Sequence, residues 1–199
     1  MDIAVIGAGS VGRALGRGLS GHGHAVIFGV RDPGDARHAD LGRVATTAEA
    51  ARGAALVIVA VPAAAVSGAI GELGLVGGQV VVDATNAVGM PVPDGFDTMG
   101  DLVASHVPAG VAVVKAFNTI GAEHLGDGRM GEQHAFLPIA GDADGVAVVL
   151  PLAGELGFEA VSLGGREAFR LVEDHARLWI HLAFRCGWGR GFAFGAIRR

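Results

Sequence analysis

The chain has 199 residues, of which 51% are hydrophobic and 18% are charged, and its formal net charge at pH 7 is −5. This length suits one domain with a substantial core, and this composition excludes a disordered chain. The acidic balance argues against a nucleic-acid partner, while the interrupted apolar runs, the lack of a signal-peptide pattern and the single cysteine predict a cytoplasmic protein that does not enter membranes.

Short apolar runs alternate with helical patterns along most of the chain. The runs predict buried strands at 2–6, 25–30, 55–61, 79–84, 111–117 and 135–140, and a short strand at 160–163. Apolar residues at helical spacing predict helices at 10–21, 47–52, 63–73, 143–156 and 167 to about 186. Continuous apolar strands between helices are typical of a parallel sheet covered on both faces. We therefore predict an α/β fold with a doubly wound, mostly parallel sheet.

The end of the chain differs from the part before it. We expect one domain over residues 1–165, and a C-terminal helix with an aromatic and basic tail over 166–199 that is too short to be an independent domain. The stretch 87–97, rich in proline and glycine, predicts a long loop, and such loops at strand ends are often functional. The aromatic residues of 179–197 can cover the sheet, line an acceptor pocket or contact a second copy, and we expect a homodimer.

A glycine motif follows the first predicted strand. Residues 7–12 read Gly7-Ala8-Gly9-Ser10-Val11-Gly12, a G-x-G-x-x-G between a strand and a helix. The first glycine permits a tight turn, the second lets the backbone approach a pyrophosphate, and the third lets the helix pack closely on the sheet. A lone match is weak in a chain with 34 glycines, but the strand before it, the helix after it and the second strand make it specific. The motif predicts a Rossmann-like domain that binds a nicotinamide dinucleotide at residues 7–12.

The end of the second predicted strand indicates which dinucleotide binds. An acidic residue there normally holds the ribose 2′-OH of NAD, whereas an arginine accommodates the 2′-phosphate of NADP. This chain has Val30-Arg31 and then Asp32, so we expect Val30 and Arg31 to contact NADP(H) in preference to NAD(H). The alternative is that Arg31 and Asp32 are only an exposed turn pair.

Ligands of this fold lie outside the carboxyl ends of the strands. Val61-Pro62, Thr85-Asn86 and Asn118-Thr119 follow three predicted strands, and we expect them around the nicotinamide. Asn86, Asn118 and Thr119 are candidates for positioning the nicotinamide and the acceptor, although an asparagine after a strand also forms turns. These loops offer no acid–base pair, which suits a ring-to-ring hydride transfer whose chemistry the cofactors carry.

The histidines, the cysteine and the single lysine indicate no further function. The eight histidines form no H-E-x-x-H motif and the one cysteine forms no cluster, so we predict no metal site. His175 and His181 share the closing helix with Glu173, and we expect them to be satisfied or exposed rather than proton donors. Lys115 lies in a predicted strand, and we attribute its being the only lysine to composition.

Several segments together are more restrictive than the glycine motif. They are Val5–Gly12, Gly21–Val26, Val59–Pro62, Asp83–Asn86, Val113–Ile120 and Leu171–Glu173. In these segments the chain resembles the small NADPH-dependent oxidoreductases typified by the F420-dependent NADP reductase, which share an N-terminal module with pyrroline-5-carboxylate reductase. The resemblance implies hydride transfer between NADPH and a bound acceptor, the deazaflavin F420 in the best-known members. The chain has Gly29-Val30-Arg31 where those relatives resemble Gly-Ser-Arg, and Asn118-Thr119-Ile120-Gly121 where they resemble His-Thr-Ile-Pro.

Three functions follow from this sequence. The first is an NADP(H)-dependent oxidoreductase whose partner is a small-molecule redox acceptor, coenzyme F420 or a flavin. The second is a reductase of a small imine or carbonyl substrate. The third is a protein that binds NADP(H) as a sensor and turns over nothing, and turnover of any acceptor by the pure protein separates it from the enzymes.

Overall fold

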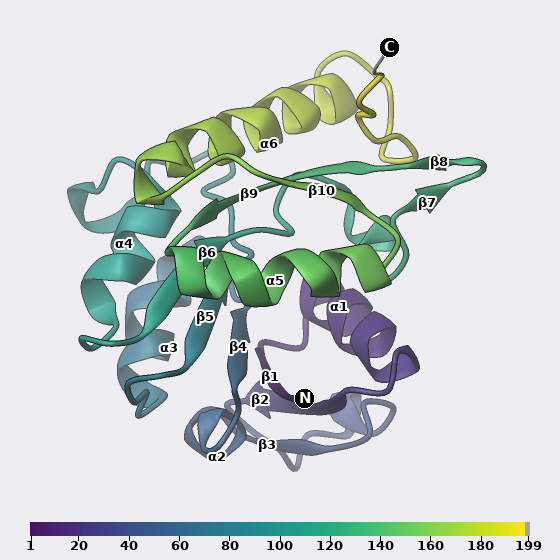
Figure 1. Cartoon of the computed structure of the whole chain (residues 1–199). Coiled ribbons are helices and arrows are strands. Elements are labelled where there is room, and N and C mark those ends of the chain that lie inside the picture. Colours follow the sequence, from purple (N-terminus) through teal and green to yellow (C-terminus); the bar gives the residue numbers. More distant parts are fainter. Residues whose placement is uncertain (198–199) are drawn as a thin grey trace.

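The computed structural model describes residues 1–197, which form an eight-stranded sheet with helices on both faces (Figure 1). The strand order is β10-β9-β6-β5-β4-β1-β2-β3. The strands are β1 (Asp2–Ile6), β2 (Ala25–Val30), β3 (Val44–Thr46), β4 (Leu56–Val59), β5 (Val80–Asp83), β6 (Ala112–Lys115), β9 (Phe136–Gly141) and β10 (Glu159–Ser162). A separate hairpin consists of β7 (Arg129–Met130) and β8 (Gln133–His134).

Six strands, β1 to β6, run parallel, whereas β9 pairs antiparallel with β6 and parallel with β10. The α-helices are α1 (Ser10–Gly21), α2 (Thr47–Ala51), α3 (Val66–Glu72), α4 (Met99–His106), α5 (Ala143–Glu155) and α6 (Phe169–Phe184). Short 3₁₀ turns are η1 (Ala36–His38), η2 (Ala63–Ala65), η3 (Pro93–Gly95), η4 (Ala122–His124) and η5 (Arg166–Ala168). The predicted α/β fold with a mostly parallel sheet is confirmed.

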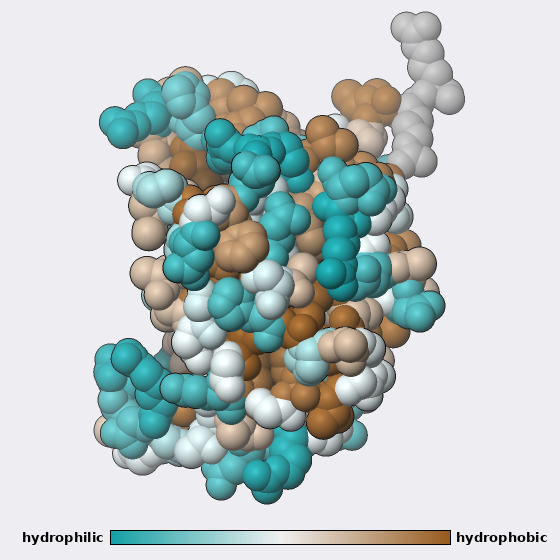
Figure 2. Space-filling model, turned by 90° about the vertical axis from the view of Figure 1, so that its left-hand side faces the viewer, coloured by the Kyte–Doolittle hydropathy of each residue, from teal (hydrophilic) through white to brown (hydrophobic). Residues whose placement is uncertain are grey.

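Alternate residues of the strands face two separate cores. On β1, Ile3 and Val5 pack in the core that α1 and α5 cover, while Ala4 and Ile6 pack in the core that includes residues of α2, α3, α4 and α6. This alternation follows from the two-residue period of a strand, and apolar residues at both phases make the run continuous. On the face that carries α3 and α4, hydrophilic residues surround smaller hydrophobic patches (Figure 2).

The structure differs from the predicted elements in particular places. The predicted strand at 55–61 ends at Val59, because the chain turns into Pro62 and the carbonyl of Ala60 packs against Gly7. The predicted strand at 111–117 ends at Lys115, and Phe117 has a φ of +61°, which no strand accommodates. The elements β3, α4, β7 and β8 were not predicted, since each is too short to show a period.

The segment after α6 packs on the body of the molecule. Trp179 stacks on Phe192 with ring centroids 5.3 Å apart and donates its indole N–H to the Phe192 carbonyl at 2.9 Å. The Phe136 amide of β9 donates to the Phe194 carbonyl at 2.8 Å, so the tail is hydrogen-bonded to the sheet at the start of β9. Phe184 and Trp188 are 60% and 59% exposed, and the homodimer stays a prediction. Arg198 and Arg199, part of the predicted basic tail, lie outside the described residues.

The helices within residues 1–197 lack the length and the apolar character that a membrane-spanning helix requires. No group of three or more histidine, cysteine, aspartate or glutamate side chains in that range is arranged to hold a metal ion.

His175 gives the tail a pH dependence. Its ring lies 4.7 Å from that of Phe194 and 5.7 Å from that of Phe136, and burial lowers the pKa of His175 below its ordinary value of 6.5. The unfolded chain therefore binds the proton more readily, so the stabilisation is complete above pH 6.5 and declines as the pH falls through the pKa of the folded state. We expect the free energy of unfolding, measured by urea titration with tryptophan fluorescence, to decline between pH 7.5 and 5.5, and to decline less in His175→Gln. Equal slopes in the two proteins would contradict this role of His175.

Candidate functional site

The loop between β1 and α1 makes a closed turn at the carboxyl end of the sheet. Gly7 has a φ of +107°, and its amide donates to the Gly29 carbonyl of β2 at 2.9 Å. A Cβ on Gly12 would overlap the Gly7 carbonyl oxygen, so only glycine lets α1 approach the turn this closely. Ala8 uses its carbonyl oxygen to accept the Arg13 Nε–H at 2.9 Å. The turn is thus fixed before any ligand binds.

The N-terminus of α1 is free to bind an anion. Gly9 is the N-cap, no side chain caps the helix, and the first turn contains no acidic residue. Gly9 and Ser10 are exposed and Val11 is half-buried, and a Cβ on Gly9 would meet no atom of the protein within 4 Å. The open space at Gly9 and the free N–H groups at the helix N-terminus fit a pyrophosphate.

The end of β2 leaves one arginine uncommitted. Val30 is buried and Arg31 is exposed, and within residues 1–197 Arg31 makes no ion pair or side-chain hydrogen bond. Asp32, by contrast, accepts the Gly34 amide at 3.0 Å and so stabilises its own turn. Arg13 is also committed, because Asp40 binds its guanidinium at 2.7 Å. Arg31 is therefore the cation at this strand end that a 2′-phosphate can recruit without breaking an existing pair.

β4 pairs with β1, β5 pairs with β4 and β6 pairs with β5, so the carboxyl ends of β4, β5 and β6 follow that of β1 along the same edge of the sheet. A Cβ built on Gly7 would lie 2.5 Å from the Ala60 carbonyl oxygen and 3.1 Å from Val61 Cγ1, which puts Val61 directly beside the dinucleotide loop. Pro62, the next residue, is exposed. The predicted residues at the end of β4 thus border the predicted residues at the end of β1.

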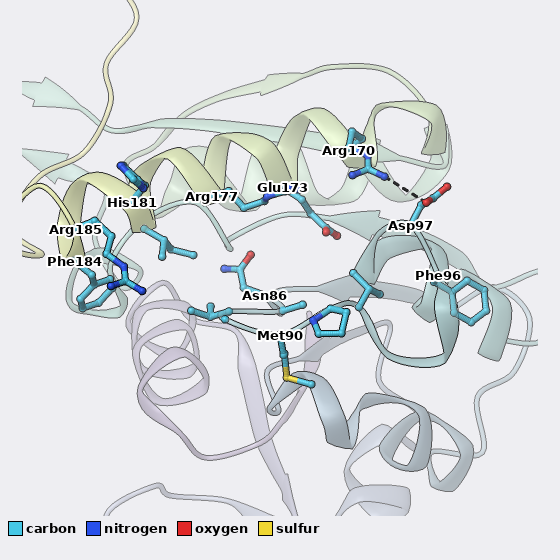
Figure 3. A pocket seen from close by; sticks show the side chains of 16 residues that line it. Asn86, Met90, Phe96, Asp97, Arg170, Glu173, Arg177, His181, Phe184 and Arg185 are labelled. Atoms are coloured by element: carbon cyan, nitrogen blue, oxygen red, sulfur yellow. Dashed lines mark ion pairs between the residues drawn. The ribbon is translucent and has the colours of Figure 1, made fainter.

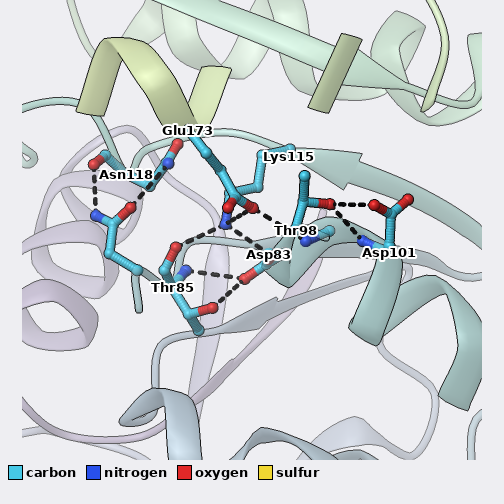
Figure 4. Close-up of polar contacts among 9 residues, drawn as sticks. Asp83, Thr85, Thr98, Asp101, Lys115, Asn118 and Glu173 are labelled. Atoms are coloured by element: carbon cyan, nitrogen blue, oxygen red, sulfur yellow. Dashed lines mark hydrogen bonds and ion pairs between the residues drawn. The ribbon is translucent and has the colours of Figure 1, made fainter. Parts of the chain in front are cut away.

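Two predicted asparagines form a pair across the ends of β5 and β6. The Asn86 Nδ2 group donates to the Asn118 carbonyl at 2.7 Å, and the Asn118 Nδ2 group donates to Asn86 Oδ1 at 3.1 Å (Figure 4). Asn118 and Thr119 follow Phe117, whose left-handed backbone costs of the order of 1–3 kcal/mol in a non-glycine residue. That strained residue turns the two polar side chains out of the strand path.

Buried polar atoms at these strand ends have unused hydrogen-bonding capacity. Within residues 1–197, Asn118 Oδ1 and Thr119 Oγ1 are buried and have no partner. A primary carboxamide needs an acceptor for its N–H and a donor for its C=O, and an amide oxygen beside a hydroxyl group offers both. These two atoms have the hydrogen-bonding chemistry that the carboxamide of a nicotinamide needs, and the roles of Asn86, Asn118 and Thr119 stay a prediction.

A buried charged cluster lies next to this pair. The Lys115 ammonium contacts Asp83 Oδ2 at 2.8 Å, the Thr85 carbonyl at 2.6 Å and Glu173 Oε1 at 3.2 Å (Figure 4). Asp83 Oδ1 accepts the amide and the hydroxyl of Thr85 at 2.9 and 2.6 Å. Glu173 Oε1 also accepts the Gly100 amide of α4 at 3.1 Å. One cluster thus joins β5, β6, the Thr85 turn, α4 and α6.

A cavity of about 870 Å³ opens between α6 and the loop after β5 (Figure 3). Its wall combines apolar and cationic side chains, including Met90, Ile180, Phe184, Arg177 and Arg185. Asn86 and Glu173 also line it, so the cavity adjoins both the asparagine pair and the charged cluster. Its dimensions and its mixed wall suit a flat ring system that carries negative charge.

Sequence reasoning did not identify three groups in this region. Lys115 is central to the charged cluster, although its solitary occurrence had been attributed to composition. Glu173 lies in the cavity wall and is its only buried carboxylate within residues 1–197. Arg185 follows α6 and faces the loop 86–97 across the cavity. The signal available for Lys115 was a lysine within an otherwise apolar predicted strand. A buried lysine is rare unless an opposite charge pairs with it, so this lysine predicts a buried partner.

Comparison with known proteins gives three strong similarities. Residues 2–87 match the family described as NADP oxidoreductase, coenzyme F420-dependent. A solved structure from Arthrobacter sp. FB24, described as a candidate F420-dependent NADP-reductase, is 30% identical over 100% of both chains, with a TM-score of 0.87. A hypothetical protein from Sinorhizobium meliloti is 31% identical over 83% of this chain and 85% of its own, with a TM-score of 0.72.

Two further similarities involve larger proteins. The metalloreductase STEAP3 of Rattus norvegicus is 27% identical over 173 residues, which are 86% of this chain and 35% of STEAP3. The chain therefore spans about a third of that relative. An imine reductase from Pseudomonas sp. is 18% identical, with a TM-score of 0.69 over 93% of this chain and 62% of its own, and shares the fold.

A substitution at Gly9 tests binding of the dinucleotide without a large effect on the stability of the fold. A methyl group at residue 9 meets no protein atom, but it occupies the space that a pyrophosphate needs. We expect Gly9→Ala to keep the melting temperature within about 2 °C and to weaken NADPH binding at least roughly tenfold, measured by fluorescence titration. Gly21→Ala, a change on the same helix that also meets no atom within 4 Å, is the matched control and should leave both quantities unchanged. Equal NADPH affinity in Gly9→Ala and the wild type would contradict the assignment of the pyrophosphate to the turn at Gly9.

Proposed function

Because this chain belongs to the coenzyme F420-dependent NADP oxidoreductase family, we propose that it transfers a hydride between NADPH and coenzyme F420. The chain is an NADP-dependent oxidoreductase, and its acceptor is the part of the function that is proposed. The observation that carries the proposal is the cavity beside Asn86, whose wall provides apolar surface and arginines together. A deazaflavin or a flavin, which joins a flat ring system to an anionic side chain, matches that wall.

The dinucleotide half of the proposed site is made by the first strands. The turn at Gly7–Gly12 and the N-terminus of α1 bind the pyrophosphate, and Arg31 binds the 2′-phosphate. Val61 and Pro62 border the ring, while Asn118 and Thr119 hold the carboxamide through atoms that have no other partner. The Lys115 bond to the Thr85 carbonyl fixes the backbone just before Asn86. These residues bind and orient the cofactor, and bound NADPH supplies the hydride.

The acceptor half is made by α6 and the loop 86–97. Met90, Ile180 and Phe184 provide apolar surface for a ring, and Arg185, which makes no ion pair within residues 1–197, provides positive charge for its side chain. The cavity adjoins Asn86, so a ring held there lies next to the nicotinamide edge. The positioning of the two rings does most of what a direct hydride transfer requires. The accompanying proton reaches the acceptor from solvent, because the cavity is open.

The other two functions place different demands on the site. An imine or carbonyl reductase needs a proton donor at the substrate oxygen or nitrogen, and the strand-end loops provide none. A sensor needs no acceptor cavity. The cytoplasmic location and the homodimer are retained as predictions.

The cofactor preference depends on Arg31. Removing its guanidinium leaves the 2′-phosphate without the one uncommitted cation at the end of β2. We expect Arg31→Ala to weaken NADPH binding roughly tenfold or more and to change NADH binding less than about twofold, as measured by titration calorimetry. Arg52→Ala is the control, because Arg52 is also exposed but precedes β4 and so lies at the amino ends of the strands. If the wild type binds NADH more tightly than NADPH, the preference is wrong.

The acceptor is tested by anaerobic mixing of the protein with NADPH and oxidised F420, following the deazaflavin absorbance. We expect the absorbance to decline at a rate proportional to protein concentration. Arg185→Ala should raise the KM for F420 at least roughly fivefold with NADPH affinity unchanged, because Arg185 lines only the acceptor cavity. Arg129→Ala on the β7–β8 hairpin is the control. No absorbance change in a protein that binds NADPH would reject F420, and the same assay with a flavin and with a cyclic imine then identifies the acceptor class.

A further inference from the structure

The charged cluster of Asp83, Lys115 and Glu173, next to the asparagine pair, contains two negative groups and one positive group. One ammonium, that of Lys115, is shared by the carboxylates of Asp83 and Glu173. The side chains of Lys115 and Asp83 are 0% exposed and that of Glu173 is 11% exposed. No other charged side chain within residues 1–197 pairs with any of the three, so the buried cluster has a net charge of −1.

The hydrogen bonds of the cluster determine where the excess charge lies. The ammonium donates hydrogen bonds to Asp83 and to the Thr85 carbonyl, and it forms an ion pair with Glu173 Oε1 at 3.2 Å. Asp83 is satisfied on both oxygens. Glu173 Oε1 faces the ammonium and accepts the Gly100 amide, whereas Glu173 Oε2 has no partner within residues 1–197. The unmatched carboxylate oxygen therefore belongs to Glu173.

Glu173 is also the member of the cluster that reaches the cavity. Figure 3 shows its carboxylate directed from α6 toward the space above Asn86, and both residues line the cavity. Two neighbouring cations are already neutralised at the exposed rim, since Arg170 pairs with Asp97 and Arg177 pairs with Asp174. Arg185, the remaining arginine of the cavity wall, follows the C-terminal end of α6, twelve residues after Glu173. A charge in a buried, poorly solvated position acts over a longer range than one at an exposed rim.

A nicotinamide ring differs in charge between its two redox states, because the oxidised ring is a cation and the reduced ring is neutral. We propose that the Asp83–Lys115–Glu173 cluster stabilises the oxidised ring selectively, through the excess carboxylate of Glu173, and so makes bound NADPH a stronger hydride donor than free NADPH. This inference rests on the proposed function, which sets the nicotinamide at the ends of β5 and β6 beside Asn86. The cluster then shifts the equilibrium between the bound species toward NADP⁺ and leaves the overall equilibrium of the reaction unchanged.

The test compares the affinities of the two redox states without any acceptor. The dissociation constants of NADP⁺ and NADPH are measured by titration calorimetry for the wild type, Glu173→Gln and Glu173→Asp. Gln keeps the shape and loses the charge, so the ratio of the NADP⁺ constant to the NADPH constant is expected to rise roughly three- to tenfold. Asp keeps the charge, and its ratio should stay within about twofold of the wild type.

The matched control is Asp174→Asn, which removes one negative charge from the adjacent residue of α6 at a position 52% exposed. Its ratio should not change, because Asp174 does not line the cavity and already pairs with Arg177. A second variant, Val88→Glu, adds a carboxylate at an exposed position of the same cavity and should lower the ratio, and it does not depend on the folding of Glu173→Gln. An unchanged ratio in Val88→Glu and in any folded Glu173→Gln overturns the inference. Failure of the wild type to bind either dinucleotide would instead overturn the proposed function.

Discussion

The ammonium group of Lys115 is fully buried, and much of the active edge of the sheet is arranged to satisfy it. A buried ammonium is tolerated only when each of its N–H bonds has a partner, and here the partners come from β5, from the turn after β5 and from α6. Removal of one partner from such a cluster typically costs about 3–5 kcal/mol, because the remaining charge stays buried. The position of α6 over the strand ends therefore depends on the ion pair between Glu173 and the buried Lys115.

These contacts of Lys115 explain how a cavity forms beside the asparagine pair. Glu173 brings the middle of α6 to Lys115, and its second bond, from the Gly100 amide, holds the start of α4 at the same point. The loop 86–97 connects β5 to α4 and must therefore cross beneath α6. The space enclosed between loop and helix is the cavity. Its floor adjoins Asn86 because Lys115 also binds the Thr85 carbonyl.

The parts of the molecule that depend on local sequence could be predicted, and the parts that depend on distant contacts could not. The motif at Gly7–Gly12 specifies a strand, a turn and a helix within a few residues, and all three are present. The contact between Lys115 and Glu173 joins residues far apart in the sequence, and no periodic pattern of residues predicts it. The helix α4 was missed because Met99–His106 is only eight residues long and contains Gly100, which is a poor helix former. The turn at Phe117 was missed because aromatic residues favour strands, and tertiary packing overrides that preference.

The division of the site between two stretches of chain has a consequence for how such an enzyme can change. The proposed dinucleotide contacts come from the ends of β1, β2, β4 and β6, whereas the cavity wall comes from the loop 86–97 and from one side of α6. On α6, Leu171 and Leu178 are exposed and lie outside the cavity wall, whereas Val172, Ala176 and Trp179 are buried, so the cavity-facing residues can change while the buried side of the helix and its Glu173 anchor are kept. A new electron acceptor can then be adopted through a few substitutions in one helix and one loop, with the nucleotide-binding half inherited intact.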